Sequence, residues 1–238
     1  MSGARSTLTG LLATSLVALP GCLLLAGCSS WLKSNQPVSQ VYVLRPAWAA
    51  GAATSMAASP ATAASPAVTP IAATATLQVE FPIAAPGLAT DSIAVLRSGE
   101  RLDYYSAARW AGAAPGMLQM LAVDALRATH RFAMVESDVG PFGSEYVLSL
   151  EVNHFEAEYG AAGPPTVHVA LVGTFGKRGS RDVLASFAAD SRVSADADRL
   201  QAVVAAFERA TGDALSQLAA EVPVPVPATA RKASSAKE

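Results

Sequence analysis

YVLSLEV, residues 146–152, has apolar side chains at every second position, and so does TVHVALVGTF, residues 166–175. This alternation is typical of strands that bury one face. Gly163-Pro164-Pro165 between the two runs predicts a turn. A glycine-rich turn at residues 177–180 and alternation from Val183 to Ala189 predict a third antiparallel strand. The chain therefore contains a sheet with one apolar face.

Two amphipathic helices are predicted beside these strands. Apolar residues from Leu118 to Leu126 follow Pro115 at helical spacing. Between Leu200 and Leu218, apolar residues recur at helical spacing and mark one face of a helix of roughly 24 residues. Asp196 or Ser194 is placed to cap this helix. We therefore expect an α+β fold: an antiparallel or mixed sheet with both helices packed on one face, preceded by a signal peptide.

Shorter apolar runs predict the remaining strands. Leu77, Val79, Phe81 and Ile83 alternate as in one half-buried strand. The other candidates are residues 41–44, 93–96, 101–105 and 131–136.

The N-terminus has the pattern of a lipoprotein signal peptide. Residues 1–27 carry one charge, Arg5, before an apolar stretch that ends in Leu25-Ala26-Gly27-Cys28. A basic start, an apolar centre and small residues before the cleavage point define a secretory signal. We expect Cys28 to carry a diacylglycerol and an N-acyl chain, and no other cofactor. Cys22 competes, but Pro20 fixes the backbone close to its cleavage point.

An uncleaved transmembrane anchor is the alternative, since the apolar run approaches the roughly 20 residues that a bilayer requires. The small residues before Cys28 favour the processed signal. Several acyl chains hold a protein firmly at a membrane. Ser29 is the expected sorting residue and favours the periplasmic face of the outer membrane over the inner membrane.

The mature chain divides by composition. We predict a lipidated N-terminus with a short strand at residues 28–46 and a flexible Ala/Pro-rich insertion at 47–76. The α+β domain is expected at 77–221, followed by a disordered Pro/Lys tail at 222–238. The formal net charge is −2, and the domain has no basic cluster, so nucleic acid is not an expected partner.

Catalytic motifs are missing from the sequence. Residues 173–177, GTFGK, lack the spacer of a phosphate-binding loop, and no Gly-x-Ser-x-Gly occurs. His154 shares parity with the buried face of its strand, whereas His168 has the opposite parity on the next strand, so the two are expected on different faces. Glu156 and Glu158 are expected to be solvated charges. We predict neither an enzyme nor a metal site.

Tyr104, Tyr105, Arg109 and Trp110 form the most distinctive cluster. Because Tyr, Trp and Arg concentrate at interface hot spots, they could form a partner surface. Alternatively, Tyr105 and Trp110 pack under the first helix while Arg109 pairs locally. The residues alone leave both interpretations open.

Four segments resemble the ABC-type transport auxiliary lipoprotein family. They are residues 41–46, VYVLRP; 88–95, LATDSIAV; 101–105, RLDYY; and 108–111, ARWA, with Pro115 and Leu118-Gln119 beyond them. The chain departs from the family in its Ala/Pro insertion after Pro46 and in Ser92, where members often carry arginine.

The resemblance implies a non-enzymatic outer-membrane lipoprotein. Its partners would be a mammalian-cell-entry (MCE) domain protein with an ABC permease and ATPase, in a system that moves lipids across the periplasm. The chain would be the docking component and would touch membrane lipids through its anchor. The alternative is a periplasmic lipid-binding carrier with an apolar pocket. Homo-oligomerisation is left open.

Overall fold

The computed structural model describes residues 39–46, 48, 74–98, 101–141 and 143–224. Nine strands and two helices are defined. They are β1 Gln40–Tyr42, β2 Thr76–Val79, β3 Ile83–Ala84, β4 Ser92–Arg97, β5 Arg101–Trp110, α2 Ala114–Ala128, β6 Met134–Ser137, β7 Tyr146–Glu158, β8 Thr166–Lys177, β9 Val183–Ser194 and α3 Leu200–Glu221. The α+β class is confirmed.

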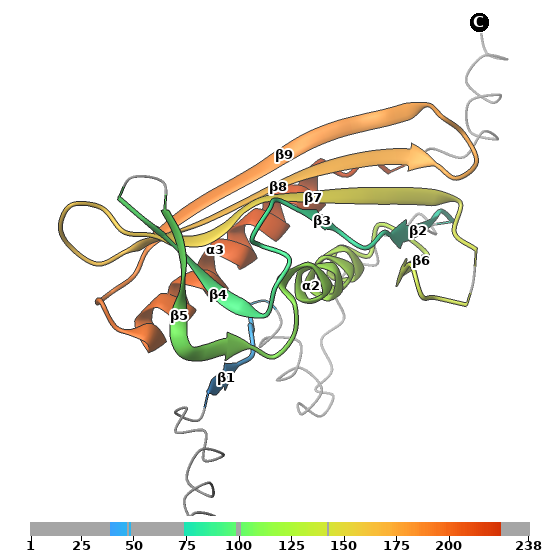
Figure 1. Ribbon diagram of the computed structural model, residues 1–238. Helices are drawn as coiled ribbons and strands as arrows, with labels where there is room; N and C mark the ends of the chain where they lie inside the picture. Colours follow the sequence, from blue (N-terminus) through green and yellow to red (C-terminus); the bar gives the residue numbers. More distant parts are fainter. Residues whose placement is uncertain (1–38, 47, 49–73, 99–100, 142, 225–238) are drawn as a thin grey trace, which may run out of the picture. The chain divides into compact units, whose positions relative to one another are not determined.

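Strand β7 organises one mixed sheet. Along one edge it pairs antiparallel with β8, and β8 pairs antiparallel with β9. Along the other edge, β2, β3 and β4 lie parallel to successive parts of β7. Beyond these, β6 lies parallel to β2, β5 lies antiparallel to β4, and β1 lies parallel to β5. Figure 1 shows β7, β8 and β9 side by side.

Strand β1 brings the segment that precedes the Ala/Pro-rich stretch into the sheet. Gln40, Val41 and Tyr42 are in register with Ala108, Arg109 and Trp110 of β5. Residues 40–42 therefore belong to the same sheet as β7, although more than thirty residues separate β1 from β2.

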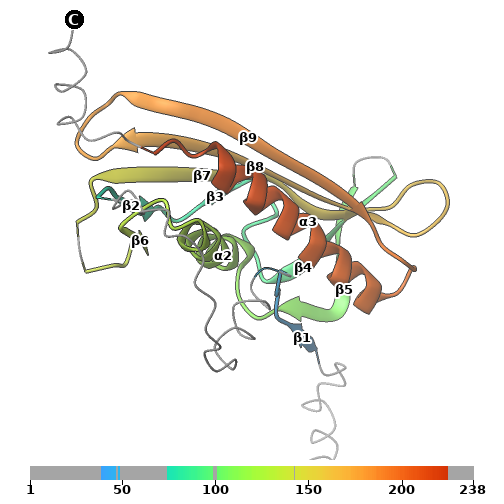
Figure 2. The same cartoon turned by 180° about the vertical axis from the view of Figure 1, so that it is seen from behind.

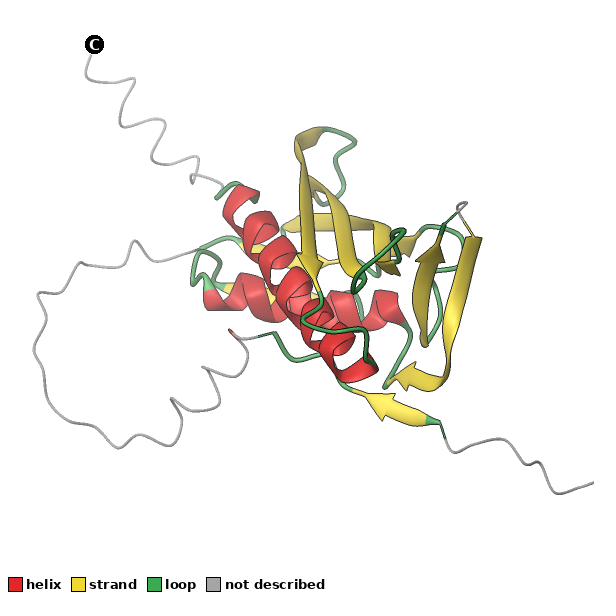
Figure 3. Cartoon of the chain, turned by 90° about the vertical axis from the view of Figure 1, so that its left-hand side faces the viewer, coloured by secondary structure: helices red, strands yellow, loops and turns green. Residues whose placement is uncertain are grey.

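Both helices lie on the same side of the sheet (Figure 3), with α3 lying along β8 and β9 (Figure 2). Helix α2 has Pro115 in its first turn, where the missing N–H costs nothing. The buried residues of α3 include Val203, Phe207, Ala214 and Leu218, which recur at helical spacing. The predicted apolar stripe of this helix is confirmed. No helix among the described residues is long and apolar enough to cross a membrane.

The predicted cap of α3 is wrong. The helix begins after Arg199, which makes no side-chain capping hydrogen bond. Asp196 instead lies 3.4 Å from Nη1 of Arg209, one of two weak contacts between these side chains. Ser194 ends β9, and its hydroxyl meets that of Thr166 at 3.1 Å. Both candidate caps are thus engaged elsewhere.

The single strand predicted through residues 77–83 is also wrong. Leu77 and Val79 are buried in β2, but Phe81 and Ile83 are exposed. Pro82 lies between β2 and β3, and a proline cannot donate a ladder hydrogen bond. The interruption reverses the side-chain alternation, so the second half of the run points away from the core.

The domain extends beyond its predicted end at residue 221. Val222 is fully buried and closes α3, where its backbone N–H donates to the carbonyl of Leu218. Residue 222 therefore belongs to the core rather than to the tail. The predicted tail from 225 and the predicted insertion at 49–73 lie outside the described residues.

Candidate functional site

The predicted signal peptide, Cys28 and Ser29 lie outside the described residues, which begin at Ser39. The structure therefore bears on the candidate surfaces of the domain, and the lipid anchor remains a prediction from sequence.

Tyr104 and Arg109 of β5 lie on the surface. The Tyr104 hydroxyl donates to the carbonyl oxygen of Gly87 at 2.9 Å. The Arg109 guanidinium approaches the Asp91 carboxylate at 3.6 Å, with both side chains about half exposed. Such an exposed ion pair contributes little to stability. Their role in a partner surface stays a prediction.

Tyr105 is half-buried in a chain of hydroxyl hydrogen bonds. Its oxygen lies 2.9 Å from the Tyr159 hydroxyl, which donates to the Asp198 carboxylate at 2.6 Å. Burial raises the pKa of Tyr105 above its ordinary value. The pKa of Tyr159 is raised further, first by burial and then by its hydrogen bond to Asp198. This chain joins β5, the end of β7 and the start of α3.

Trp110 is a core residue, so its assignment to a partner surface is wrong. Only 1% of it is exposed. Its ring contacts Phe155 of β7 at 5.8 Å and Phe207 of α3 at 5.1 Å between centroids. The alternative interpretation is also wrong in one respect, because Trp110 packs under α3 rather than under the first helix.

An open apolar groove of about 410 Å³ lies between the segment that follows β1 and helix α2. We call it the β1 groove. None of the described residues that line it is charged, and Val43, Phe81 and Met120 are each more than half exposed. Its walls also include Leu44, Gly112, Met117 and Leu121. Exposed apolar residues that gather in one place are typical of a binding surface.

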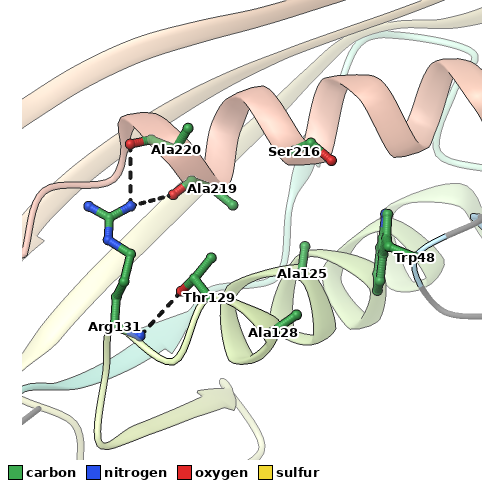
Figure 4. Close-up of a pocket in the computed structure, with 8 residues that line it drawn as sticks. All are labelled: Trp48, Ala125, Ala128, Thr129, Arg131, Ser216, Ala219 and Ala220. Carbon is green, nitrogen blue, oxygen red and sulfur yellow. Dashed lines mark hydrogen bonds between the residues drawn. The ribbon is translucent and has the colours of Figure 1, made fainter. Parts of the chain in front are cut away.

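A second hollow of about 360 Å³ lies between α2 and α3, lined mainly by small side chains and by Trp48 (Figure 4). At one end, the Arg131 guanidinium donates to the carbonyl oxygens of Ala219, Ala220 and Val222 at 2.8, 3.3 and 2.6 Å. These carbonyls end α3, where they have no partner within the helix. Arg131 is therefore committed to closing the helix.

His154 and His168 lie together, so the prediction that they lie on different faces is wrong. A β-bulge between Val152 and His154 shifts the register of β7 against β8. Side chains with even numbers therefore leave the core face after the bulge, and His154 comes to face His168. The two imidazole rings stack with centroids 4.0 Å apart.

Two glutamates complete this cluster on the sheet face away from α3. We call His154, Glu156, Glu158 and His168 the histidine cluster, and their facing ligand atoms all lie within 4.8 Å of one another. Nδ1 of His154 is 2.6 Å from Glu156, and Nδ1 of His168 is 3.0 Å from Glu158. Glu156 is buried, so the expectation that it is a solvated charge is wrong.

Asp190 borders the histidine cluster from β9. Its carboxylate lies 2.8 Å from Nε2 of His168. This hydrogen bond lowers the pKa of Asp190 below its ordinary value, against a smaller effect of burial. Among the described residues, this is the one cluster of three or more His, Asp, Glu or Cys side chains with metal-ligand spacing.

Residues 173–177 lie within β8. Gly173 is in register with Phe187 of β9, and the Phe187 ring fills the space where a Cβ would stand. Backbone N–H groups that pair in a ladder are not arranged to cradle a phosphate. The segment is therefore part of the sheet.

Comparison with known proteins shows the family of the chain. The model of the ABC-type transport auxiliary lipoprotein component matches residues 59–222, well over half of its length. The chain belongs to this family of auxiliary lipoproteins. The resemblance recognised in the sequence is confirmed.

Two solved structures resemble this auxiliary lipoprotein. Protein XCC0632 from Xanthomonas campestris aligns with a TM-score of 0.60 and 23% identity over 76% of this chain and 93% of that chain. An uncharacterized protein aligns with a TM-score of 0.57 and 14% identity over 79% and 100%, respectively. At these identities the matches show the fold alone. No curated protein shows significant similarity.

Sequence reasoning missed two features of the auxiliary lipoprotein. The β1 groove joins Val43, Phe81 and Met120 from three separate segments, and no local pattern marks it. The histidine cluster depends on a bulge at Asn153. Its only sequence signal is that the apolar positions change from even to odd numbers between Val152 and Phe155. Both features arise from tertiary pairing.

Proposed function

We propose that the chain is the outer-membrane docking component of an MCE-associated ABC system that moves lipids across the periplasm. Its membership of the auxiliary lipoprotein family supports a transport role. The predicted lipid on Cys28 would fix it to the membrane, and Ser29 favours the periplasmic face of the outer membrane. On this proposal the chain performs no catalysis and works by protein contacts.

The β1 groove is the observation that carries the docking role. Phe81 and Met120 present large apolar surfaces to solvent in a groove whose described lining residues are all uncharged. Aromatic and methionine side chains are enriched at protein interfaces, and methionine adapts to irregular partners. A charged partner segment would lose its hydration there without gaining a counter-ion. The occupant is therefore an uncharged apolar segment of the MCE-domain partner.

The groove adjoins the strand nearest the lipid anchor. Val43 lines it directly after β1, and β1 begins at Gln40. The eleven residues that follow Cys28 up to Ser39 span at most about 40 Å when extended. The tether would thus hold the groove near the membrane surface, where a partner that crosses the periplasm ends.

A lipid carrier is the second candidate function. The wholly apolar lining of the β1 groove would also accept an acyl chain. Against this, the space between β7 and α3 is filled by Trp110, Phe155 and Phe207, whose rings contact one another. The described groove is open rather than enclosed, which suits a protein segment better than a sequestered lipid.

A pull-down from membranes with the lipidated chain tests the docking role. We expect recovery of an MCE-domain protein with its permease and ATPase. Met120→Glu should reduce recovery at least tenfold, because it introduces a charge into the apolar groove. Val183→Glu is the matched control, since Val183 is also an exposed apolar residue, at 63% against 53% for Met120, and lies on strand β9. Equal recovery with both variants would refute docking at the groove.

Native mass spectrometry separates docking from carriage. The chain extracted from membranes should retain no stoichiometric phospholipid beyond its own covalent lipid. A retained phospholipid that is lost in Met120→Glu would replace the docking proposal with the carrier.

The anchor has its own test. Replacing Cys28 with Ala should leave the signal peptide uncleaved and the protein membrane-bound, because the peptidase acts after the cysteine is lipidated. The masses of the two proteins and their partition between membrane and soluble fractions give the answer. Normal maturation of the Cys28→Ala variant would show that Cys28 is not the lipid-attachment site and would favour Cys22.

A further inference from the structure

We propose that the histidine cluster is a zinc site, with His154, Glu156, Glu158 and His168 as ligands. The inference does not depend on the docking role. It concerns the sheet face opposite α3, away from the β1 groove.

The bulge in β7 builds the site. Phe155 contacts Phe207 of α3, so its neighbours His154 and Glu156 point away from the helix. Glu156 pairs directly across the ladder with His168 of β8. The ligands thus come from two adjacent strands, a rigid support for a metal site.

Each glutamate has one oxygen held by a neighbour and another that faces the cluster. Oε2 of Glu156 accepts the backbone N–H of Phe155 at 2.6 Å. Oε2 of Glu158 accepts from Arg192 at 2.7 Å. The Oε1 atom of each glutamate is left to meet a histidine Nδ1.

Asp190 supplies the outer partner that metal-bound histidines have. Nε2 of His168 lies 2.8 Å from the Asp190 carboxylate, while Nδ1 faces the cluster. A carboxylate that accepts one ring N–H fixes the tautomer and directs the other nitrogen to the metal. His168 is 2% exposed, so its ring has little freedom to turn.

The donor set suits zinc. Imidazole nitrogen with carboxylate oxygen suits Zn²⁺, whereas Mg²⁺ and Ca²⁺ require an all-oxygen shell. Zinc–ligand distances of about 2.0–2.2 Å place tetrahedral ligand atoms roughly 3.4 Å apart. The four facing atoms lie within 4.8 Å of one another, and two pairs are already at 2.6 and 3.0 Å. To coordinate zinc, the two hydrogen-bonded pairs would separate and the more distant pairs would approach, each by a small side-chain movement.

The acidic side chains around the cluster outnumber the arginine that contacts them, which favours binding of a divalent cation. Three carboxylates, Glu156, Glu158 and Asp190, face one arginine, Arg192, in this group of contacts. One Zn²⁺ bound at the ring nitrogens and the two glutamates would balance this excess of negative charge.

Calorimetric titration with Zn²⁺ of the lipidated chain, in detergent and after EDTA treatment, tests the proposal. We expect one Zn²⁺ per chain at neutral pH, with protons released on binding and affinity that weakens towards acid pH. His154→Gln should weaken binding at least tenfold, and Asp190→Asn roughly 10- to 100-fold, as outer partners do. His154 is about half exposed, so its replacement should leave the fold intact.

His130→Gln is the matched control, because His130 lies in the turn after α2, outside the cluster. It should bind zinc as the unmodified chain does. Zinc should also raise the unfolding temperature of the unmodified chain and of His130→Gln, but not of His154→Gln. Absence of saturable binding, or equal binding by His154→Gln, would overturn the proposal.

Discussion

Trp110 of β5 meets Phe207 of α3 edge to face, with centroids 5.1 Å apart and ring planes at 80°. Phe207 also contacts Phe155 of β7 at 5.0 Å. The three rings therefore connect strands β5 and β7 to the long helix α3. Aromatic pairs in this geometry stabilise a protein beyond the area they bury.

Phe207→Ala should therefore lower the free energy of unfolding by about 3–5 kcal/mol. Phe207 is fully buried, so its removal leaves a cavity between rigid neighbours. Urea unfolding followed by tryptophan fluorescence measures the change. Phe81→Ala, the same change at an exposed site, should cost less than about 1 kcal/mol. Similar costs for both variants would contradict this account of the core.

Arg131 should stabilise the C-terminal end of α3. The last turn of the helix has no basic residue, and Arg131 supplies a cation to three of its terminal carbonyls. Arg131→Ala should cost about 1.5–3 kcal/mol, the range for hydrogen bonds from a charged group. Arg181→Ala, an exposed arginine between β8 and β9, should cost less than about 0.5 kcal/mol. Thermal unfolding compares them, and an equal loss would refute the capping role.

Gly173 makes space for an aromatic ring in the sheet. A Cβ at this position would collide with Phe187, its partner on β9. Gly173→Ala should destabilise the chain by about 1–3 kcal/mol, as overpacking does. Gly160→Ala is the control, because nothing lies within 4 Å of its added Cβ. In a Phe187→Ala background the cost of Gly173→Ala should nearly vanish, and a full cost there would show that the ring is not the obstacle.

The strands and α3 could be predicted because burial itself imposes their periodicity. Leu148, Leu150 and Val152 face the core at a period of two, and Phe207 lies on the predicted stripe of α3. These patterns extend over many residues, so they survive local irregularities. The fold class follows from them together with the turns.

Single-residue irregularities account for the errors about which side chains face the core in β7 and in residues 77–83. The bulge at Asn153 and the break at Pro82 each reverse the alternation beyond them. Because the period is two, one extra residue moves a whole strand half to the other face. The histidine cluster therefore could not be found by counting parity from Val152.

Partner surfaces were predicted less well for a different reason. Tyr, Trp and Arg are enriched both at interfaces and at the margins of cores, so composition does not separate Trp110 from Tyr104. The exposed fraction is 1% for Trp110 and 44% for Tyr104, and this difference depends on how β5 pairs within the sheet. Prediction of the β1 groove requires the same tertiary information.

Tyr159 links stability to alkaline pH. Its pKa is raised above the ordinary value of 10.0, first by burial and then by donation of its proton to Asp198. A group with a raised pKa in the folded state contributes stability that is present below the unfolded pKa. That contribution is lost as pH rises from about 10 through the folded pKa, because the unfolded chain releases its proton first. The free energy of unfolding should therefore fall with pH above about 10.

Tyr159→Phe should flatten this alkaline fall, because the variant has no proton to lose at this position. At neutral pH the same change should cost about 1 kcal/mol, since it removes the hydrogen bonds to Tyr105 and Asp198. Tyr42→Phe, whose hydroxyl bonds only to Gln40 among the described residues, is the control for loss of one hydroxyl. Urea unfolding at a series of pH values gives both quantities. Parallel curves for the unmodified chain and Tyr159→Phe above pH ~10 would mean that Tyr159 ionises equally in the folded and unfolded states.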